Sequence, residues 1–346
     1  MQIIDLVPDL RPTILAARQV RDARNTLARF LPYQERQAVS YRLGRRKRAD
    51  QTVPVRAIDA PAVPIRRPGI VDVRGDLPAI TPIVDLSEQD LTDEMVLAMQ
   101  LAGINVDWTD AVNSSAALAS LTVDNTFEAM RGQLLSTLGI SLATEDGDTH
   151  SIAPEDFGAD PAQIITVTTP WNAQGGDALA DYEAAHNEHA DRAGDAAGVV
   201  LTTRRVRRAL LAALAVKYPQ APVDMNTLNA YFTANELPQV ATYDRTFTAY
   251  NGTKTRVYPE GHLTFLPGED DPVGRTELGV TQEAVQQVNR IQPNGRTALN
   301  AGEAPGVTIV TLGRDNPVQR SVKAAALGMP VLHDADQITV VRGVFG

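Results

Sequence analysis

The stretch from residue 44 to residue 84 constrains the fold more than any other part of this sequence. It places six prolines among closely spaced valines and isoleucines, which favour extended strands. Proline has no N–H to donate, so it confines a strand to a sheet edge. Two extended runs flank Arg66-Arg67-Pro68-Gly69, which predicts a turn and hence a long two-stranded arm. Because an isolated hairpin is marginal in water, the sequence predicts a partner surface for this arm.

Positive charge gathers in the first part of the chain. Residues 1–74 hold 15 Lys+Arg against 7 Asp+Glu, whereas the remainder holds 17 against 35. A basic arm on an acidic body binds either nucleic acid or the acidic body of another copy. The densest cluster, Arg45-Arg46-Lys47-Arg48, fits both partners equally well on charge alone.

Composition narrows the classes of protein to consider. The 346 residues include no cysteine, which excludes disulfide frameworks, cysteine-ligated zinc, iron–sulfur clusters and thiol nucleophiles. No run approaches the ~18 continuous apolar residues of a membrane helix. The N-terminus, Met1-Gln2-Ile3-Ile4-Asp5, shows no secretory signal, so neither export nor a membrane partner is expected.

The remaining sequence predicts a mixed α+β body. The strongest helical pattern covers 123–138, with an apolar residue every three or four positions and Gly139 as its C-cap. Asn251-Gly252 between two β-rich runs predicts a hairpin. Other helices are expected at 13–31, at 88–101, from Asp177 to about Ala193, after Thr203 and after Asp224, and strands near 164–169, 261–266, 307–312 and 337–344.

Candidate catalytic and metal-binding residues are few. The sequence has no glycine-rich phosphate loop, serine elbow or His-Glu-x-x-His motif, so no enzyme is expected. His186 and His189 share a helical face with Glu183 and could hold a metal, but their acidic neighbours favour a solvated polar face. The triplet Glu269-Asp270-Asp271 lacks the periodicity of a cation loop, which favours an exposed turn. Neither a metal nor a cofactor is therefore expected.

A second basic cluster lies at a helix start and comprises Arg204, Arg205, Arg207 and Arg208. Such a cluster can meet phosphates, but no aromatic residue interleaves with it to stack on bases. A surface face or a salt bridge to another subunit is the favoured interpretation.

Several segments follow one another in an order that belongs to one family. They are Ile65–Gly69 continuing to Asp76–Pro78, Phe127–Leu142, Tyr243–Tyr258 continuing to Pro267, Gly274–Gly279, and Met329–Leu332 with Gln337–Val344. Ile65–Gly69 with Asp76–Pro78 is similar to the extended-loop return strand of the lambda-type major capsid protein E family of tailed bacteriophages, and Phe127–Leu142 is similar to its spine helix. Tyr243–Pro267 is similar to the late β segment of that family, and Gly274–Gly279 to the Gly-Arg-Thr stretch after it. Met329–Leu332 with Gln337–Val344 is similar to the closing strand. The chain therefore resembles that family, which has the Hong Kong 97 fold.

The resemblance implies an α+β Hong Kong 97-like fold in five parts. They are an N-terminal arm (1–43), an extended loop (44–84), a peripheral domain with a spine helix (85–165), an axial domain (166–300) and a return to the peripheral domain (301–346), with the hairpin region 242–266 assignable to either domain.

The resemblance also implies a function. The chain would be a virion protein that self-assembles into hexamers and pentamers and forms an icosahedral head around packaged double-stranded DNA, held non-specifically on the inner surface. Assembly would occur in the host cytoplasm with a portal, a decoration protein and a separate scaffolding protein, because the chain begins almost directly at the arm. Inter-subunit contacts would come from the arm and loop, through Arg45, Arg46, Lys47, Arg48, Arg56, Arg66, Arg67 and Arg74. The loop holds no lysine beyond Lys47, so the lysine cross-linking of some relatives is not expected.

Three alternatives stay open. An encapsulin-type compartment shell would enclose host-enzyme cargo in place of DNA. A DNA-binding protein that uses the basic N-terminal arm would bind heparin as a monomer and form no large assembly. A metal hydrolase built on His186 and His189 would contain bound metal in stoichiometric amount.

Overall fold

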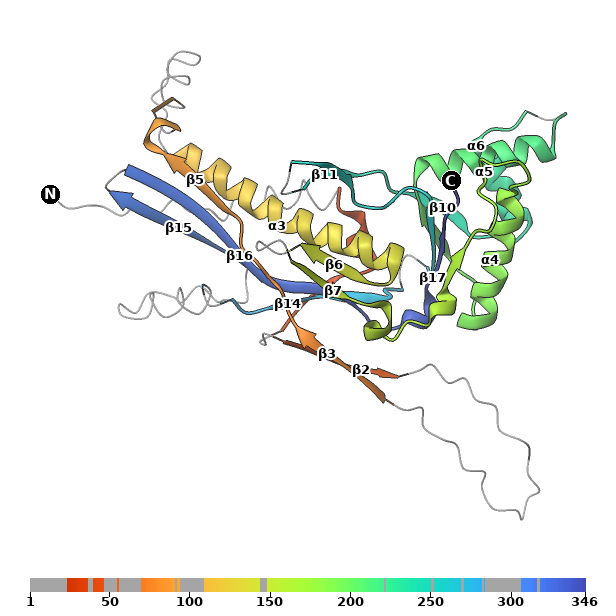
Figure 1. The fold of residues 1–346 in the computed structure, drawn as a ribbon, viewed down its shortest axis with the longest axis horizontal. Coiled ribbons are helices and arrows are strands. Elements are labelled where there is room, and N and C mark those ends of the chain that lie inside the picture. Colours follow the sequence, from red (N-terminus) through yellow and green to blue (C-terminus); the bar gives the residue numbers. More distant parts are fainter. Residues whose placement is uncertain are drawn as a thin grey trace.

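The computed structural model describes residues 24–36, 40–46, 55, 70–90, 92–93, 109–143, 148–220, 222–249, 252–268, 271–281, 283, 306–315 and 318–346. A long helix lies along one sheet, and three shorter helices gather around a second sheet at the other end of the molecule (Figure 1). The larger apolar core includes residues of the long helix, of the first sheet and of one face of the second sheet, and a smaller core lies between the other face of the second sheet and the three shorter helices.

The larger sheet is organised around one long strand, β16 (Val318–Leu332). Leu327 pairs with Gly279 and also with Ala79, so β14 and β4 flank β16 on opposite sides. The partners of β16 are β14 (Gly274–Gly279), β15 (Val307–Asp315), β4 (Ala79–Ile80) and β5 (Ile83–Ser87). At the edge of the sheet, β1 (Tyr33–Glu35) pairs with β14 in parallel. The strand expected near 307–312 is therefore confirmed.

Helix α3 (Thr109–Thr137) packs against this sheet and includes most of the helix expected at 123–138. The predicted apolar stripe is buried: Val123, Phe127, Met130, Leu134 and Leu138 are at most 2% exposed. The predicted C-cap is wrong, because the left-handed residue is Leu138 (φ 57°) and not Gly139. This conformation costs a non-glycine residue about 1–2 kcal/mol, and burial of the Leu138 side chain offsets it. Gly139 has a different role, since a Cβ there would lie 2.9 Å from the Ile152 carbonyl oxygen.

The smaller sheet has five strands in the order β10-β9-β13-β17-β8. Their bounds are Gln239–Thr242, Val199–Thr202, His262–Leu266, Thr339–Arg342 and Ile164–Thr166. The strands expected near 261–266 and 337–344 are confirmed. The strand expected at 164–169 is shorter than predicted and lies half-buried at the sheet edge.

Three helices cover this sheet: α4 (Ala178–Ala193), α5 (Arg204–Lys217) and α6 (Met225–Ala234). Helices α4 and α6 begin after Asp177 and Asp224 as predicted, and the carboxylates of both residues cap these helices by accepting backbone N–H groups of the first turn. Thr203 precedes α5, but its side chain makes no cap bond. The Arg204 N–H is instead accepted by the carboxylate of Asp244, which lies far along the chain.

Short elements complete the described chain. The expected hairpin around Asn251-Gly252 is confirmed as β11 (Thr246–Thr248) paired with β12 (Lys254–Arg256). A second small hairpin joins β6 (Ile140–Ala143) to β7 (Thr149–Ile152). The single-turn 3-10 helices are η1 (Thr26–Arg29), η2 (Pro154–Phe157), η3 (Pro161–Gln163) and η5 (Ala335–Gln337).

Two expected N-terminal helices differ from the structure or lie largely outside it. The prediction of a helix at 13–31 is wrong for residues 24–31, the part that the structure describes, where only η1 forms. Leu27, Phe30 and Leu31 are fully buried here, which one face of a thin amphipathic helix would not achieve. Of the helix expected at 88–101, residues 88–90 and 92–93 are helical and the rest lies outside the described residues. Among the described helices, none is long and apolar enough to cross a membrane.

Candidate assembly surfaces

A two-stranded hairpin extends away from the larger sheet (Figure 1). It consists of β2 (Ser40–Arg46) paired antiparallel with β3 (Ile70–Asp76). A two-stranded arm is therefore confirmed. Its first strand differs from the prediction, because Ile70–Asp76 pairs with residues 40–46, which begin before the predicted 44–84 stretch. The predicted turn at Arg66–Gly69 lies outside the described residues.

Tyr41 and Leu77 anchor the hairpin to the body. Both are buried in the main core, at 3% and 5% exposed. A Cβ on Gly75 would come within 2.7–2.9 Å of the Tyr41 ring, so glycine lets the two strands close over that ring. Burial, followed by the charges of Asp156 and Asp76, raises the pKa of the Tyr41 phenol, so this anchor stays neutral. The hairpin thus projects from a fixed base.

Three of the eight predicted contact residues fall on this hairpin. Arg45 and Arg46 pair with Val71 and Ile70 at the end of the ladder distant from Tyr41. Arg74 is exposed and lies opposite Arg42 in the ladder. The other predicted contact residues, Lys47, Arg48, Arg56, Arg66 and Arg67, lie outside the described residues. The hairpin therefore carries positive charge outward from the body.

A buried polar cluster ties the N-terminal segment to α3. The Glu128 carboxylate accepts the Leu27 backbone N–H (3.1 Å) and the Tyr243 hydroxyl (2.7 Å). It also pairs with Arg131 at 3.2 Å, and both side chains are essentially unexposed. The Arg131 Nε donates to the Thr276 hydroxyl (2.9 Å). Burial and the neighbouring Glu128 carboxylate raise the pKa of Tyr243.

A second buried glutamate, paired with partly exposed arginines, lies in β14. Glu277 of β14 is unexposed and contacts Arg36 at 2.6 Å as well as Arg275. The Arg36 backbone N–H also donates to the Leu278 carbonyl at 2.7 Å, which extends the β1–β14 contact by one residue. Sequence reasoning missed this pair, because a glutamate between Thr276 and Leu278 in a strand looks solvent-facing. These contacts connect the residues before the hairpin rigidly to the body.

Two arginines of the second basic cluster form ion pairs within the chain. Arg204 lies 3.7 Å from Asp244, and Arg205 lies 2.9 Å from Glu260. Arg256 contacts both carboxylates, at 3.3 and 2.7 Å. Ion pairs at this exposure contribute only about 0–1 kcal/mol each. They nevertheless offset positive charge on this surface, for which the sequence alone allowed either phosphate or another subunit as the partner.

His186 and His189 lie on the buried face of α4, so the predicted solvated face is wrong. They are 8% and 2% exposed, and both rings stack against Phe265 of β13. Burial lowers the pKa of His186, and burial with Arg192 and His186 lowers that of His189 to about 4. Glu183 instead accepts the Tyr231 hydroxyl at 2.6 Å. Within the described residues, no three His, Asp or Glu side chains are placed to hold a metal ion.

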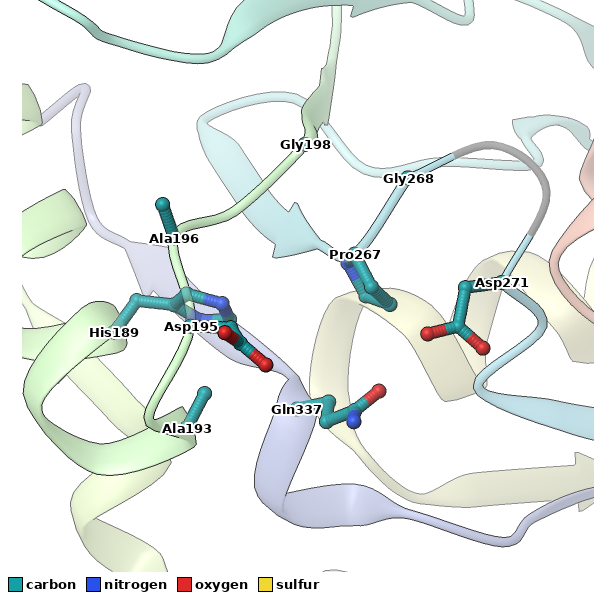
Figure 2. Close-up of a pocket in the computed structure, with 9 residues that line it drawn as sticks. All are labelled: His189, Ala193, Asp195, Ala196, Gly198, Pro267, Gly268, Asp271 and Gln337. Carbon is teal, nitrogen blue, oxygen red and sulfur yellow. The ribbon is translucent and has the colours of Figure 1, made fainter.

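A cavity of about 330 Å³ lies beside His189 (Figure 2). The carboxylates of Asp195 and Asp271 lie on its opposite sides, with the Gln337 side chain between them. Asp271 is exposed, as expected for the 269–271 turn, and its N–H donates to the Gly268 carbonyl. Residues 269 and 270 lie outside the described residues. The cavity is therefore polar and acidic.

Comparisons with known proteins identify a family and a shared fold. A family model described as phage major capsid protein E matches residues 31–341. Two similar solved structures are a phage-related protein from Bordetella bronchiseptica RB50 and a prophage protein from Escherichia coli CFT073 described as a capsid protein. The first has 13% identity and a TM-score of 0.57, with 96% of each chain covered. The second has 12% identity and a TM-score of 0.54, and covers 96% of this chain and 98% of that chain.

At such identity the two structures establish the shared fold, and the family match extends over most of the chain. A search of curated proteins finds no match. The expected α+β, Hong Kong 97-like capsid fold is confirmed, as is the expectation of a viral shell protein. The chain belongs to the phage major capsid protein E family.

Proposed function

We propose that this capsid subunit forms hexamers and pentamers that close into an icosahedral head around packaged double-stranded DNA. The observation that carries the proposal is the anchored β2–β3 hairpin, which leaves the body and bears Arg45, Arg46 and Arg74. Contacts that use different patches on the two partners generate rings and closed shells. Permanent interfaces of this kind bury upward of about 2,000 Å².

The five-part division of the chain belongs to this proposal, with the arm at 1–43, the loop at 44–84, the peripheral domain at 85–165, the axial domain at 166–300 and the return at 301–346. The role of the subunit is structural and not enzymatic. A scaffolding protein, a portal and a decoration protein are the further proposed partners, with assembly in the host cytoplasm. The resemblance to tailed-phage capsid proteins supports these partners.

The hairpin arginines are proposed to contact neighbouring subunits. The charge division supports this role, since residues 1–74 are net basic and the remainder is net acidic. Individual exposed ion pairs are weak, but many repeated around a ring set the register and the encounter rate. About 1 M salt shortens the Debye length to ~3 Å and should slow assembly.

The test is electron microscopy of the purified chain, alone and co-expressed with a scaffolding protein, for the wild type and for charge-reversal variants. Arg45→Glu with Arg46→Glu should block or slow shell formation and leave a folded monomer. The matched control reverses Lys217 and Lys254, which are exposed on the body, and should assemble at close to the wild-type rate.

Three outcomes would contradict these proposals. Shells that form at the normal rate from the Arg45/Arg46 variant, without salt dependence, but pack less DNA would place these arginines against the genome. A chain that stays monomeric under every condition, with scaffold supplied, and is retained on heparin would favour a DNA-binding protein. Shells isolated with host enzyme in place of DNA would identify a compartment shell.

A further inference from the structure

The cavity beside His189 lies where α4 ends and the loops after β13 and before β17 meet. Its polar lining consists of His189, Asp195, Asp271 and Gln337, and the rest is alanine, glycine and proline. Among the described residues that line it there is no lysine or arginine. Asp195 and Asp271 are exposed at its opening, where a group from another molecule can reach them.

A buried polar side chain adds to these carboxylates. His189 is 2% exposed, yet its ring forms part of the cavity wall. One ring nitrogen, Nδ1, lies 2.8 Å from the Thr339 hydroxyl. The same hydroxyl oxygen accepts a hydrogen bond from the Arg192 guanidinium. These contacts fix the ring, and burial keeps it neutral with a pKa of about 4. The wall therefore holds a neutral polar ring that does not repel a cation.

The shape of the lining favours an extended cation over a metal ion. Figure 2 shows the two carboxylates on opposite sides of the space, with the Gln337 side chain between them. A metal needs converging ligands, and no such group of three exists among the described residues. A guanidinium is planar and presents five N–H donors, so it can serve carboxylates that lie apart.

We propose that this cavity receives an arginine side chain from the extended loop of a second copy of the chain. The inference rests on the proposed shell function, which brings the loop of one subunit onto the body of another. The loop supplies Arg56, Arg66 and Arg67 as occupants. Charge complementarity selects them, because the loop lies in the basic part of the chain and the cavity in the acidic part.

The absence of cysteine from the sequence makes cross-linking a clean test. Ala196→Cys places a thiol at the cavity, and Arg56→Cys, Arg66→Cys or Arg67→Cys, one at a time in the same chain, places one in the loop. The matched control is Ala234→Cys, exposed at the end of α6, with the same loop changes. Assembled shells are treated with a short bis-maleimide and run on a denaturing gel.

At least one loop position should give covalent oligomers with Ala196→Cys at roughly ten times the yield with Ala234→Cys. In a second measurement, Asp195→Asn with Asp271→Asn should slow assembly roughly tenfold, as expected for loss of one charged hydrogen-bonded contact worth about 1.4 kcal/mol. Glu188→Gln with Asp191→Asn, two exposed carboxylates of α4, is the control for net charge and should assemble at close to the wild-type rate.

Failure of the cavity assignment and failure of the shell function give different results. If shells form normally and no loop position exceeds the Ala234→Cys control, the cavity does not receive the loop, although the chain still builds shells. If no variant and no wild-type protein assembles with scaffold present, both proposals are wrong.

Discussion

Replacing Arg131 with methionine should destabilise the subunit strongly, because it breaks a buried ion pair from one side only. Arg131 is unexposed, pairs with Glu128, donates to Thr276 and lies 4.2 Å above the Tyr33 ring. Methionine has a similar volume, so the main loss is charge and hydrogen bonding. Glu128 would keep the Leu27 N–H and the Tyr243 hydroxyl as donors but would lose its counter-ion.

The expected cost is about 3–5 kcal/mol, the usual range for removing one partner of a buried pair. The contact with the Tyr33 ring accounts for about 0.5–2 kcal/mol of this. Adding Glu128→Gln removes the unpaired charge, so the double variant should recover about 1–3 kcal/mol of the loss. Arg131 Nη2 has no hydrogen-bond partner in the described structure, so removing that nitrogen strands no further acceptor.

Urea unfolding of the unassembled subunit, followed by circular dichroism, measures these free energies of unfolding. A matched control is Arg245→Met, which loses the hydrogen bond to Asn125 but no buried carboxylate partner. Limited proteolysis should cut the Arg131→Met variant faster between residues 24 and 36, because β1 loses its support. A loss below about 1 kcal/mol, or a double variant as unstable as the single one, would refute the argument.

Three further predictions follow from the same contacts. Gly132→Ala should block folding or assembly at expression, since a Cβ there would lie 2.1 Å from the Val257 carbonyl oxygen; near-wild-type stability in urea would contradict that contact. Boiling mature shells in detergent should give a single band near the chain mass of 37.3 kDa, and covalent ladders would show loop cross-linking. The pKa values of His189 and His333 are both lowered to about 4, so unfolding takes up protons and stability should fall as pH drops from about 6.5 to 4, by up to roughly 1.4 kcal/mol per pH unit for each histidine. Pairing His189→Gln with the wild type in pH-dependent urea titrations tests this slope, which should be shallower in the variant.

Local sequence patterns predicted the elements that short-range physics determines. The apolar spacing of α3, the Asn251-Gly252 hairpin and the helix starts at Asp177 and Asp224 depend on residues within a few positions of one another, and the structure confirms them. The same patterns failed where distant residues decide. Asp244 caps α5 in place of the Thr203 side chain. The polar-looking face of α4 is buried because His186 and His189 stack against Phe265 of β13.

The candidate surfaces divide in the same way. Proline and charge indicated a projecting basic arm, and the hairpin has that position. They did not indicate its anchor at Tyr41, because a tyrosine in a basic strand gives no sign of burial. The cavity was also missed, since His189 and Asp271 are 82 positions apart in the sequence and meet only when the helix end approaches the loop after β13.

The buried polar cluster explains how a short strand is held in one register. β1 pairs with β14 over three residues, and burial of Leu27, Phe30 and Leu31 alone would tolerate small shifts along the sheet. A shift by one residue would turn Tyr33 away from Arg131 and separate Arg36 from Glu277. Arg131 would keep Glu128 and Glu277 would keep Arg275, but each buried charge would lose one of its stabilising contacts, which costs more than a displaced apolar contact. The two glutamates thus select one position for the segment that leads directly into the hairpin, and this fixes where the basic arm leaves the body of each subunit.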